Sequence, residues 1–313
     1  MKVIKILVLE KLNFNEKYVI KKITGSKIDF FSDFKKKKLN HSIIFCRLKF
    51  NLNKSFLTKF KNLKYICSPT TGLNHIDVDY CKLNGIKIIN LKTKNNIVKN
   101  ITSTSEYTFA LILSLIRNIP QSSKHLILKK NWDRDKFISK TFSEITIGII
   151  GFGRIGKNLN KLLNLLKIKT LINDINTSKD NFSNSNQKNT NLNLLLKKSD
   201  IVSLHINYSK FNKNFVNSKF LNKMKKDAVL INTSRGEIIN EFELINHLKI
   251  NKNFYVALDV LSNETINLIK KNILLKNLLN LNAIITPHLG GATFRGIQNA
   301  EKHIINELSK QLK

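Results

Sequence analysis

Short apolar runs, rich in β-branched residues, recur along the whole chain with room for a helix between one run and the next. They occupy residues 3–9, 42–46, 64–68, 86–90, 146–150, 169–173, 201–205, 228–232, 254–258 and 283–286. Near-continuous apolar strands are typical of parallel sheets that helices cover on both faces, because neither face of such a strand is left to water. The sequence therefore predicts an α/β fold built on parallel sheets.

A polar stretch is followed by a mainly apolar one near residue 100. Residues 92–100 are polar, and a mainly apolar stretch follows them. In that stretch Ser103 and Glu106 have the spacing of a capping box, and Pro120 marks a stop. We expect this helix to form the hinge between two domains. A second polar stretch, at residues 176–190, is expected to form a surface loop.

A cluster of glycines follows the fifth apolar run. Gly151, Gly153 and Gly156 have GxGxxG spacing, and four of the eleven glycines lie between positions 148 and 156. In such a turn the first glycine permits the tight bend, the second admits a pyrophosphate and the third lets the helix pack on the strand. Asp174 ends the next run, where a carboxylate accepts the ribose hydroxyls and repels the extra phosphate of NADP. The pattern predicts a dinucleotide site and favours NAD.

Polar residues suited to catalysis follow the later apolar runs. They are Arg235, Asp259, Glu264 and His288. Because the carboxyl ends of parallel strands share one crevice, we expect these residues to converge on the glycine turn.

Each of these side chains suggests a role. Only six of the 54 basic residues are Arg, and an Arg at position 235 offers the planar fork that grips a carboxylate. An imidazole with an ordinary pKa of ~6.5 suits proton exchange at His288, and a carboxylate such as Glu264 would raise that pKa and fix the tautomer. The alternatives are a structural ion pair for Arg235, a packing role for His288 and a solvated position for Glu264.

These motifs, in this order, resemble the D-isomer-specific 2-hydroxyacid dehydrogenase family, and they are similar to its phosphoglycerate dehydrogenase branch. The motifs are TTGLNHID, STSEYTFALILSLIRNIP, NWDRDKF, GFGRIG, SDIVSLH, LINTSRGEIIN, ALDVLSNE and TPHLGGAT, and together they span essentially the whole chain. The resemblance implies two Rossmann-like domains: a discontinuous substrate-binding domain of residues 1–98 and 289–313, and an NAD-binding domain of residues 99–288. It also implies a homodimer.

The resemblance also implies roles for individual residues. It assigns Arg235 to the substrate carboxylate, Glu264 to a dyad and His288 to acid/base catalysis, in agreement with the roles inferred above. At the NAD it places Gly151, Gly153, Arg154, Ile155, Gly156, Asp174, His205, Thr233, Ser234, Asp259, Gly290 and Gly291. At the substrate it places Arg47, Lys49, Thr71, Gly72 and Leu73. No metal site is expected, and a structural role is the alternative for His205.

The substrate is expected to be a small 2-hydroxy or 2-oxo acid. Arg47 and Lys49 look like the basic pair that faces the phosphate in phosphoglycerate dehydrogenases, which favours oxidation of 3-phosphoglycerate to 3-phosphohydroxypyruvate. Reduction of hydroxypyruvate or glyoxylate is the close alternative, and a non-catalytic, NAD-sensing co-repressor is an alternative of another class. Because the chain ends after the last helix of the family, we do not expect feedback by serine through a C-terminal regulatory domain.

Two positions depart from the family pattern. Asn207 stands where the family has a proline after the SLH motif, and Thr265 stands where a proline follows the dyad glutamate. Both changes affect the rigidity of a loop more than the chemistry, so the placement of Glu264 is less constrained.

The formal charge of +33 could suggest a polyanionic partner. Its Lys residues are scattered, however, and the longest basic run is Lys35–Lys38, so we expect a solvated surface and no specific nucleic-acid partner. The opening apolar run is too short for a signal peptide and no run is long enough for a membrane span. Cys46, Cys67 and Cys81 lack CxxC spacing, which indicates a reduced, cytoplasmic protein.

The remaining cysteine and histidine residues are expected to have structural roles. Cys46 and Cys67 lie in apolar runs and are expected to be buried, inert thiols. The histidines outside the catalytic motifs are expected to be surface or packing residues, and they are His41, His75, His125, His247 and His303.

Overall fold

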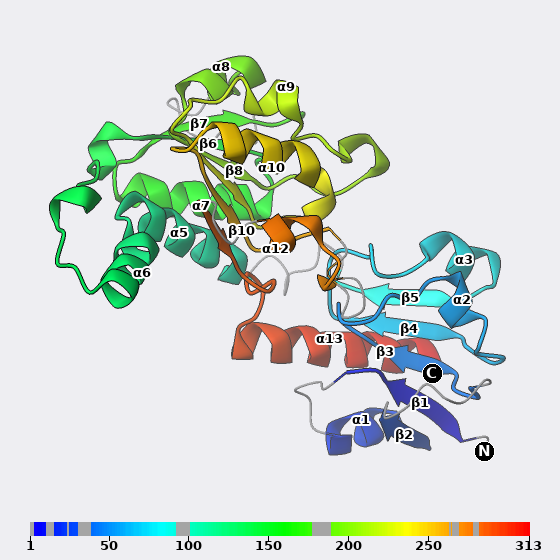
Figure 1. The fold of residues 1–313 in the computed structure, drawn as a ribbon. Coiled ribbons are helices and arrows are strands. Elements are labelled where there is room, and N and C mark those ends of the chain that lie inside the picture. The colour runs from blue at the N-terminus through cyan, green and yellow to red at the C-terminus, as the bar shows by residue number, and fades with distance from the viewer. Residues whose placement is uncertain are drawn as a thin grey trace. The chain divides into compact units, whose positions relative to one another are not determined.

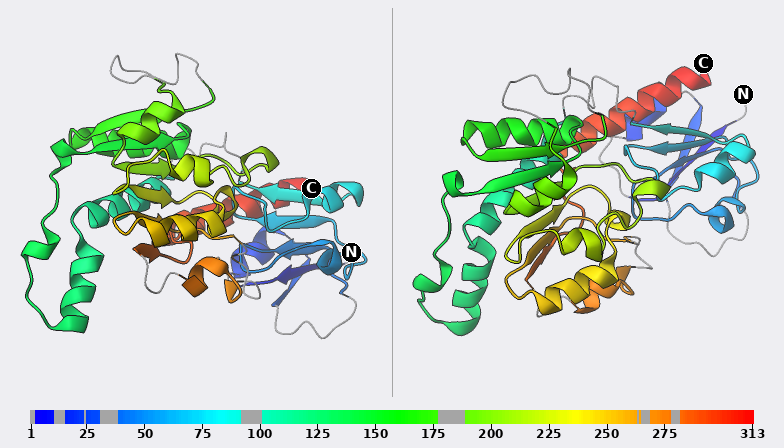
Figure 2. Two further views of the ribbon diagram at one scale, coloured as in Figure 1. Left: turned by 45° about the horizontal axis from the view of Figure 1, so that its top comes forward. Right: turned by 90° about the horizontal axis from the view of Figure 1, so that it is seen from above.

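The computed structural model divides the chain into two compact units (Figures 1 and 2). Unit 1 comprises Met1–Ile101, Glu264–Ile269 and Ala292–Lys313, and unit 2 comprises Thr102–Asn263 and Lys270–Gly291. The structure describes residues 3–10, 16–23, 25–30, 39–91, 101–176, 189–262, 264, 269–277 and 282–313. The polar stretch at 92–100 and most of the expected loop at 176–190 lie outside these ranges, and the functions expected of the two domains stay predictions.

Unit 1 contains a five-stranded parallel sheet in the order β2-β1-β3-β4-β5. Its strands are β1 (Ile4–Val8), β2 (Ser26–Phe30), β3 (Ile43–Phe45), β4 (Tyr65–Ser68) and β5 (Lys87–Asn90). Its helices are α1 (Glu16–Lys22), α2 (Lys54–Leu57), α3 (Val78–Leu83) and α13 (Phe294–Leu312). Helix α13, red in Figure 1, returns from the far end of the chain to this sheet.

Both faces of this sheet carry a core. Ile6 and Val8 of β1 pack with α1 and with Ile304 of α13, whereas Leu7 of the same strand packs with Leu57 of α2 and Cys81 of α3. Successive residues of a strand point to opposite faces, so burial on both sides requires apolar residues at consecutive positions. This requirement explains the near-continuous apolar runs of the sequence.

Unit 2 contains a six-stranded parallel sheet in the order β11-β10-β9-β8-β6-β7. Its strands are β6 (Thr146–Ile150), β7 (Lys169–Asn173), β8 (Ile201–Leu204), β9 (Val229–Asn232), β10 (Tyr255–Leu258) and β11 (Ala283–Ile285). Its α-helices are α5 (Ser103–Ile116), α6 (Ile119–Lys129), α7 (Arg154–Leu165), α8 (Leu192–Lys198), α9 (Ser218–Leu221), α10 (Glu241–Ile250) and α12 (Ile273–Asn277). Among its described residues, the short 3-10 helices are η1 (Asp135–Phe137), η2 (Phe142–Glu144), η4 (Lys210–Asn212) and η5 (Gly236–Ile238).

The core of unit 2 lies between the sheet and helices α5 and α7. Ile112 of α5 and Leu159 of α7 are fully buried against Ile147 and Ile149 of β6 and Ile231 of β9. The sheet is thus held by helices that come from before and after its first strand.

The predicted α/β class with parallel sheets is confirmed, and every apolar run named above forms a strand. Strand β2 is absent from the prediction because it lies at a sheet edge and carries Lys27 and Asp29 among half-buried residues. The predicted helix start was wrong by one residue. Ser103 is buried inside α5, and the N-cap is Thr102, whose hydroxyl donates to Glu106.

Pro120 also differs from its prediction. It lies in the first turn of α6, where a missing N–H costs no helical hydrogen bond, so it begins a second helix as well as following the first.

The three cysteines are buried and free, which confirms the prediction for Cys46 and Cys67. Burial raises the pKa of both thiols, and it raises the pKa of Cys81 to about 11. The neutral thiol is therefore the dominant form at each position. Among the described residues, no helix has the length and apolar character needed to cross a membrane.

Candidate active site

The glycine turn links β6 to α7. Gly151 has φ 95°, and a Cβ atom at this position would lie 2.7 Å from the carbonyl oxygen of His205, so only glycine fits. A Cβ at Gly156 would collide with the Gly151 carbonyl oxygen, which shows how closely the helix packs on the turn. Gly153 is the N-cap of α7, and nothing lies within 4 Å of the place where its Cβ would be. This open backbone at a helix N-terminus fits a dinucleotide pyrophosphate.

Two charged residues lie next to the turn. Asp174 follows β7, and its carboxylate accepts hydrogen bonds from the backbone N–H of Phe152 at 2.5 Å and of Asn176 at 2.7 Å. The carboxylate predicted to receive the ribose is therefore anchored to the glycine turn itself. Arg154 opens α7, and burial lowers the pKa of its guanidinium.

His205 follows β8 and packs its backbone against Gly151. Its Nε2 lies 2.9 Å from the Ser203 hydroxyl, and its Nδ1 is buried without a hydrogen-bond partner. Although part of the residue reaches solvent, burial of the ring lowers its pKa to about 4. The imidazole is consequently neutral at physiological pH, and the residue shapes the wall of the turn.

The turn that carries Arg235 follows β9 and is organised by a fully buried amide. The Asn232 Oδ1 accepts from the N–H and the hydroxyl of Ser234, and its Nδ2 donates to the Arg235 carbonyl at 2.8 Å. The guanidinium donates to the Ser234 carbonyl at 2.6 Å. Thr233 is buried, and its hydroxyl lies 2.8 Å from that of Thr108 on α5. The backbone and the guanidinium of Arg235 are thus both fixed locally.

His288 lies in a loop that a buried carboxylate holds together. Asp259, which follows β10, accepts from the Thr286 hydroxyl and from the N–H groups of Leu289 and Gly290, each at 2.7 Å. The N–H of His288 donates to the Asp259 carbonyl at 2.9 Å, and His288 has φ 55°. A left-handed conformation is uncommon for a residue other than glycine and persists only when its surroundings impose it.

The environment of Asp259 sets its acidity. Burial raises the pKa of this carboxyl group, and the three loop hydrogen bonds act in the opposite direction. Asp259 is expected at the NAD. In the structure most of its acceptor capacity is used within the His288 loop, and Gly290 packs on it, while the backbone of Gly291 faces open space.

All of these unit 2 residues lie at one edge of the sheet, because the strands are parallel and each residue follows a carboxyl end. The structure thus gathers most of the predicted constellation, including the glycine turn, Asp174, Arg235, Asp259 and His288. Glu264 is half-buried and belongs to the short segment that clusters with unit 1. Its pairing with His288 stays a prediction.

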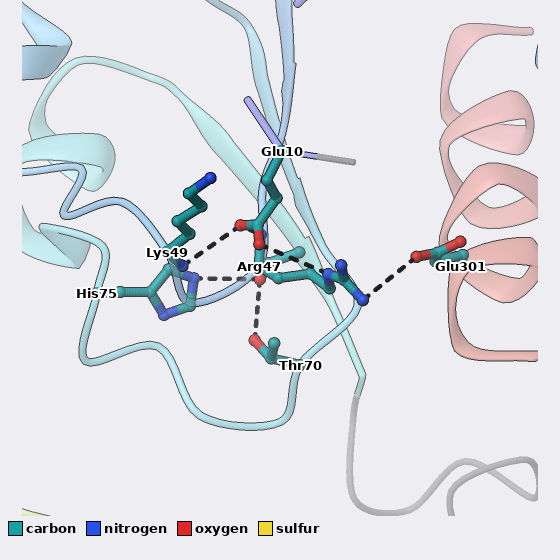
Figure 3. Close-up of polar contacts among 7 residues, drawn as sticks. Glu10, Arg47, Lys49, Thr70, His75 and Glu301 are labelled. Atoms are coloured by element: carbon teal, nitrogen blue, oxygen red, sulfur yellow. Dashed lines mark hydrogen bonds and ion pairs between the residues drawn. The ribbon is translucent and has the colours of Figure 1, made fainter. Parts of the chain in front are cut away.

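In unit 1 the loop after β3 is built around Glu10 (Figure 3). The Glu10 carboxylate accepts from the N–H of Arg47 at 2.6 Å and of Lys49 at 3.4 Å, and it lies 3.6 Å from the Arg47 Nε. On the other side, NH1 of Arg47 lies 3.9 Å from Glu301 of α13, whose side chain is only 1% exposed. Lys49 has its ammonium 5.8 Å from the centre of the Phe50 ring. The guanidinium predicted to face a phosphate is therefore flanked by two carboxylates.

The predicted substrate loop follows β4. The Ser68 hydroxyl lies 2.9 Å from that of Thr70 and 3.2 Å from Nε2 of His75, and Figure 3 labels Thr70 and His75. The Thr70 hydroxyl donates to the Gly72 carbonyl at 2.8 Å. His75 is buried, as expected of a packing residue. The last contact holds the backbone carbonyl of Gly72, in the middle of the three residues expected to meet the substrate, which are Thr71, Gly72 and Leu73.

Sequence reasoning missed four residues that shape these sites. The sequence shows Asn232 only as the end of an apolar run and Gly236 only as part of a motif. Because the chain has only eleven glycines, the presence of one at position 236 could have indicated a close backbone contact there. Glu10 and Glu301 carried no local signal, because they are 291 positions apart and meet Arg47 only in the folded unit.

Residues 109–290 match the family described as "D-isomer specific 2-hydroxyacid dehydrogenase, NAD binding domain". The chain is 34% identical over 262 residues to an erythronate-4-phosphate dehydrogenase of Wigglesworthia glossinidia brevipalpis, covering 82% of this chain and 60% of that relative. It is 29% identical over 251 residues to a D-3-phosphoglycerate dehydrogenase of Synechocystis sp., covering 80% of this chain and 42% of that relative. The chain thus spans between about two fifths and three fifths of the length of these relatives.

The solved structures agree with the sequence matches. A D-lactate dehydrogenase of Aquifex aeolicus, crystallised with NAD and lactic acid, is similar with a TM-score of 0.82 and 26% identity, over 98% of this chain and 95% of that one. The match includes the glycine turn, Arg235 and His288 within one NAD binding domain. The chain belongs to the D-isomer specific 2-hydroxyacid dehydrogenase family and carries its NAD binding domain.

Proposed function

We propose that the protein is an NAD-dependent dehydrogenase that interconverts a D-2-hydroxy acid and the corresponding 2-oxo acid. The observation that supports this function most strongly is the shared edge of the unit 2 sheet, where an open glycine turn, Arg235 and His288 each follow a strand. When bound, the cofactor would accept the C2 hydride of a hydroxy acid as NAD+, or supply a hydride to the 2-oxo acid as NADH. The protein has to hold the acid, move one proton and keep the reacting atoms aligned.

His288 moves the proton. In the direction of reduction its imidazolium donates to the C2 oxygen, and in the direction of oxidation its neutral ring removes the hydroxyl proton. The Asp259 clamp and the left-handed backbone of His288 restrict where the ring can point. In this proposal Glu264 partners the imidazole and stabilises its charged form, so that the dyad carries the proton reversibly near neutral pH.

Arg235 holds the substrate carboxylate and polarises the adjacent C2 oxygen. Its backbone carbonyl is held by Asn232, and its guanidinium donates to Ser234, so the fork is oriented before any acid binds. Backbone N–H groups of Thr71 to Leu73 complete the grip on the carboxylate. Positioning and electrostatics supply most of the acceleration.

For the substrate we propose a phosphorylated acid, with 3-phosphoglycerate as the first candidate. Arg47 and Lys49 follow β3, and the two curated relatives reported above are named for phosphorylated 2-hydroxy acids. A specific observation favours the rival, reduction of an unphosphorylated acid such as hydroxypyruvate or glyoxylate. The charge of Arg47 is shared by Glu10 and Glu301, which weakens its attraction for a phosphate.

The protein is also proposed to form a homodimer. The segment from α6 to the turn after η1 exposes an unusual number of apolar side chains, which marks an interaction surface. They are Ile119, Leu126, Ile127, Leu128, Trp132 and Ile138. Trp132 is 85% exposed, and replacing it with Glu should convert a dimer seen by light scattering into a monomer.

Measuring turnover with different acids distinguishes the phosphoglycerate dehydrogenase, the glyoxylate or hydroxypyruvate reductase and the non-catalytic co-repressor. The purified protein is incubated with NAD and a panel of D-2-hydroxy acids, and with NADH and the matching 2-oxo acids, with and without a phosphate group, while NADH absorbance is followed. We expect D-3-phosphoglycerate to give the highest kcat/KM. A higher kcat/KM for glyoxylate or hydroxypyruvate would assign the protein to the reductase alternative. Absence of turnover with every acid, together with tight and salt-sensitive DNA binding, would favour the NAD-sensing co-repressor instead.

A further inference from the structure

A buried carboxylate contacts Ser262 and Asn272, which flank in sequence the segment that carries Glu264. Glu241 is the first residue of α10, and only 8% of it is exposed. A carboxylate buried to this extent requires hydrogen-bond donors to offset the loss of water. Glu241 finds them on two other parts of unit 2, and neither is part of the sites described above.

The two donors flank the Glu264 segment. The N–H of Ser262 donates to Glu241 Oε1 at 2.7 Å, and the side-chain amide of Asn272 donates to Oε2 at 2.9 Å and to Oε1 at 3.2 Å. The Asn272 amide also donates to the Ser262 carbonyl at 3.0 Å. Ser262 and Asn272 are the residues on either side of positions 263–271, so one carboxylate ties the two ends of that stretch together.

A second contact fixes the first of these ends. A Cβ atom at Gly236 would collide with the backbone of Leu261 and with the N–H nitrogen of Ser262. The turn that carries Arg235 therefore lies directly against the strand exit that leads to Glu264. Glu241 follows the same turn in the chain, so the anchor of the Glu264 segment and the Arg235 turn form one continuous piece of backbone.

We infer that Glu241 is a positioning residue that sets the place of Glu264 through Ser262 and Asn272. The inference deepens the proposed function and rests on it, because it assigns Glu241 no contact with the substrate or with NAD. Closing the ends of a stretch of chain reduces the number of conformations that the residues between them can adopt.

The test uses exchanges that preserve shape. Glu241→Gln removes the charge, so the amide of residue 241 meets the Asn272 amide with like donors. Asn272→Asp removes the donor but keeps the Oδ1 that accepts from the N–H of Leu275 on α12. Each variant is expected to lower kcat by about tenfold to a hundredfold, as small misplacements of catalytic groups do, with the Kd for NADH unchanged. The double variant restores a carboxylate–amide contact between positions 241 and 272 but not the donor to the Ser262 carbonyl, so it should recover part of the lost kcat.

The matched control lies in the same first helical turn. The Glu243 carboxylate also accepts from a backbone N–H, that of Ser218, and from the side-chain amide of Asn240, and among the described residues it has no bond to the Glu264 segment. Glu243→Gln should leave kcat within about twofold of the parent, as expected for a change away from the site. Melting temperatures of all variants show whether a lost activity reflects a lost fold.

A double-mutant cycle with Glu264→Gln isolates the mechanism. If Glu241 acts through Glu264, Glu241→Gln should cause no further loss of kcat in the Glu264→Gln background. If the two residues act independently, the fold-losses of kcat from the two single variants should multiply. A multiplied loss, or a Glu241→Gln variant with parental kcat, would overturn the inference and leave the proposed function standing. A parent protein without turnover on any acid of the panel would overturn the proposed function and the inference with it.

Discussion

The His288 loop of unit 2 and the Arg47 loop of unit 1 are both held by a carboxylate that binds backbone N–H groups, but they differ in what carboxylates do to the functional side chain. Each follows a parallel strand, and in each a carboxylate from a neighbouring strand end accepts from two backbone N–H groups: Asp259 from Leu289 and Gly290, and Glu10 from Arg47 and Lys49. At His288 the carboxylate fixes the backbone on which the imidazole is carried. At Arg47 the carboxylates of Glu10 and Glu301 also form ion pairs with the guanidinium.

His288 is thus positioned by its loop, whereas the charge of Arg47 is neutralised by two carboxylates. The Asp259 carboxylate accepts hydrogen bonds from two backbone N–H groups and a hydroxyl, and its charge also interacts with His288, so this loop positions the imidazole. A guanidinium between Glu10 and Glu301 stabilises a buried charge, so its first role is in the fold of unit 1. The comparison predicts that substitutions in the first loop cost activity and substitutions in the second cost stability.

The largest effect is expected at His288. His288→Gln removes the proton donor and keeps a polar side chain of similar size, so kcat should fall by about 10²–10⁴-fold with little change in melting temperature. Steady-state kinetics in both directions measure it. His303→Gln on α13, outside the catalytic motifs, is the control. Near-parental kcat in His288→Gln would show that the loop positions something other than the acid/base group.

The second effect is on stability. Arg47→Met removes a countercharge of the buried Glu301 carboxylate, and breaking such a pair should lower the free energy of unfolding by about 3 kcal/mol. This value is at the low end of the usual range because 27% of the Arg47 side chain is exposed. Denaturant unfolding measures it. Adding Glu301→Gln should restore much of the loss, and the KM of that double variant for phosphorylated acids then reports any phosphate contact separately.

A third substitution tests the carboxylate grip. Arg235→Lys keeps the charge and loses the planar fork, so kcat/KM should fall by about a hundredfold, which corresponds to two good charge-assisted hydrogen bonds. The matched control is Arg134→Lys, at an exposed position in the same unit. If both variants keep the parental kcat/KM, Arg235 belongs with Arg47 as a structural residue.

The smallest effect is a pH dependence at His205. Its pKa is lowered by burial from 6.5 to about 4, so the folded protein favours the neutral ring. The stability that this ring contributes is fully present above pH 6.5 and is lost as the pH falls toward 4. Relative to His205→Gln, the parent should lose about 2 kcal/mol across this window, with part of the full linkage value screened by solvent. Thermal unfolding at a series of pH values measures the difference, and parallel profiles would contradict the assignment.

Much of unit 2 could be predicted from sequence because its determinants are local. The GxGxxG spacing, Asp174, Arg235 and His288 each lie next to an apolar run, and parallel strands then place the run ends at one edge. The state of Arg47 could not be predicted, because Glu10 and Glu301 come from opposite ends of the chain. The start of α5 was missed by one residue since Thr102 and Ser103 are both plausible caps, and tertiary packing buries Ser103.

The central claim, that His288 and Arg235 serve hydride transfer at C2 of a D-2-hydroxy acid, is tested most directly with an isotope. The protein is incubated with NAD and D-3-phosphoglycerate carrying deuterium at C2, and with the L-isomer, and the cofactor is examined by mass spectrometry. The account predicts deuterium on the reduced cofactor from the D-isomer alone, with the yield abolished in His288→Gln and strongly reduced in Arg235→Lys. Deuterium on the reduced cofactor after incubation with the L-isomer would contradict the account. Deuterium transfer at the parental rate in both variants would also contradict it.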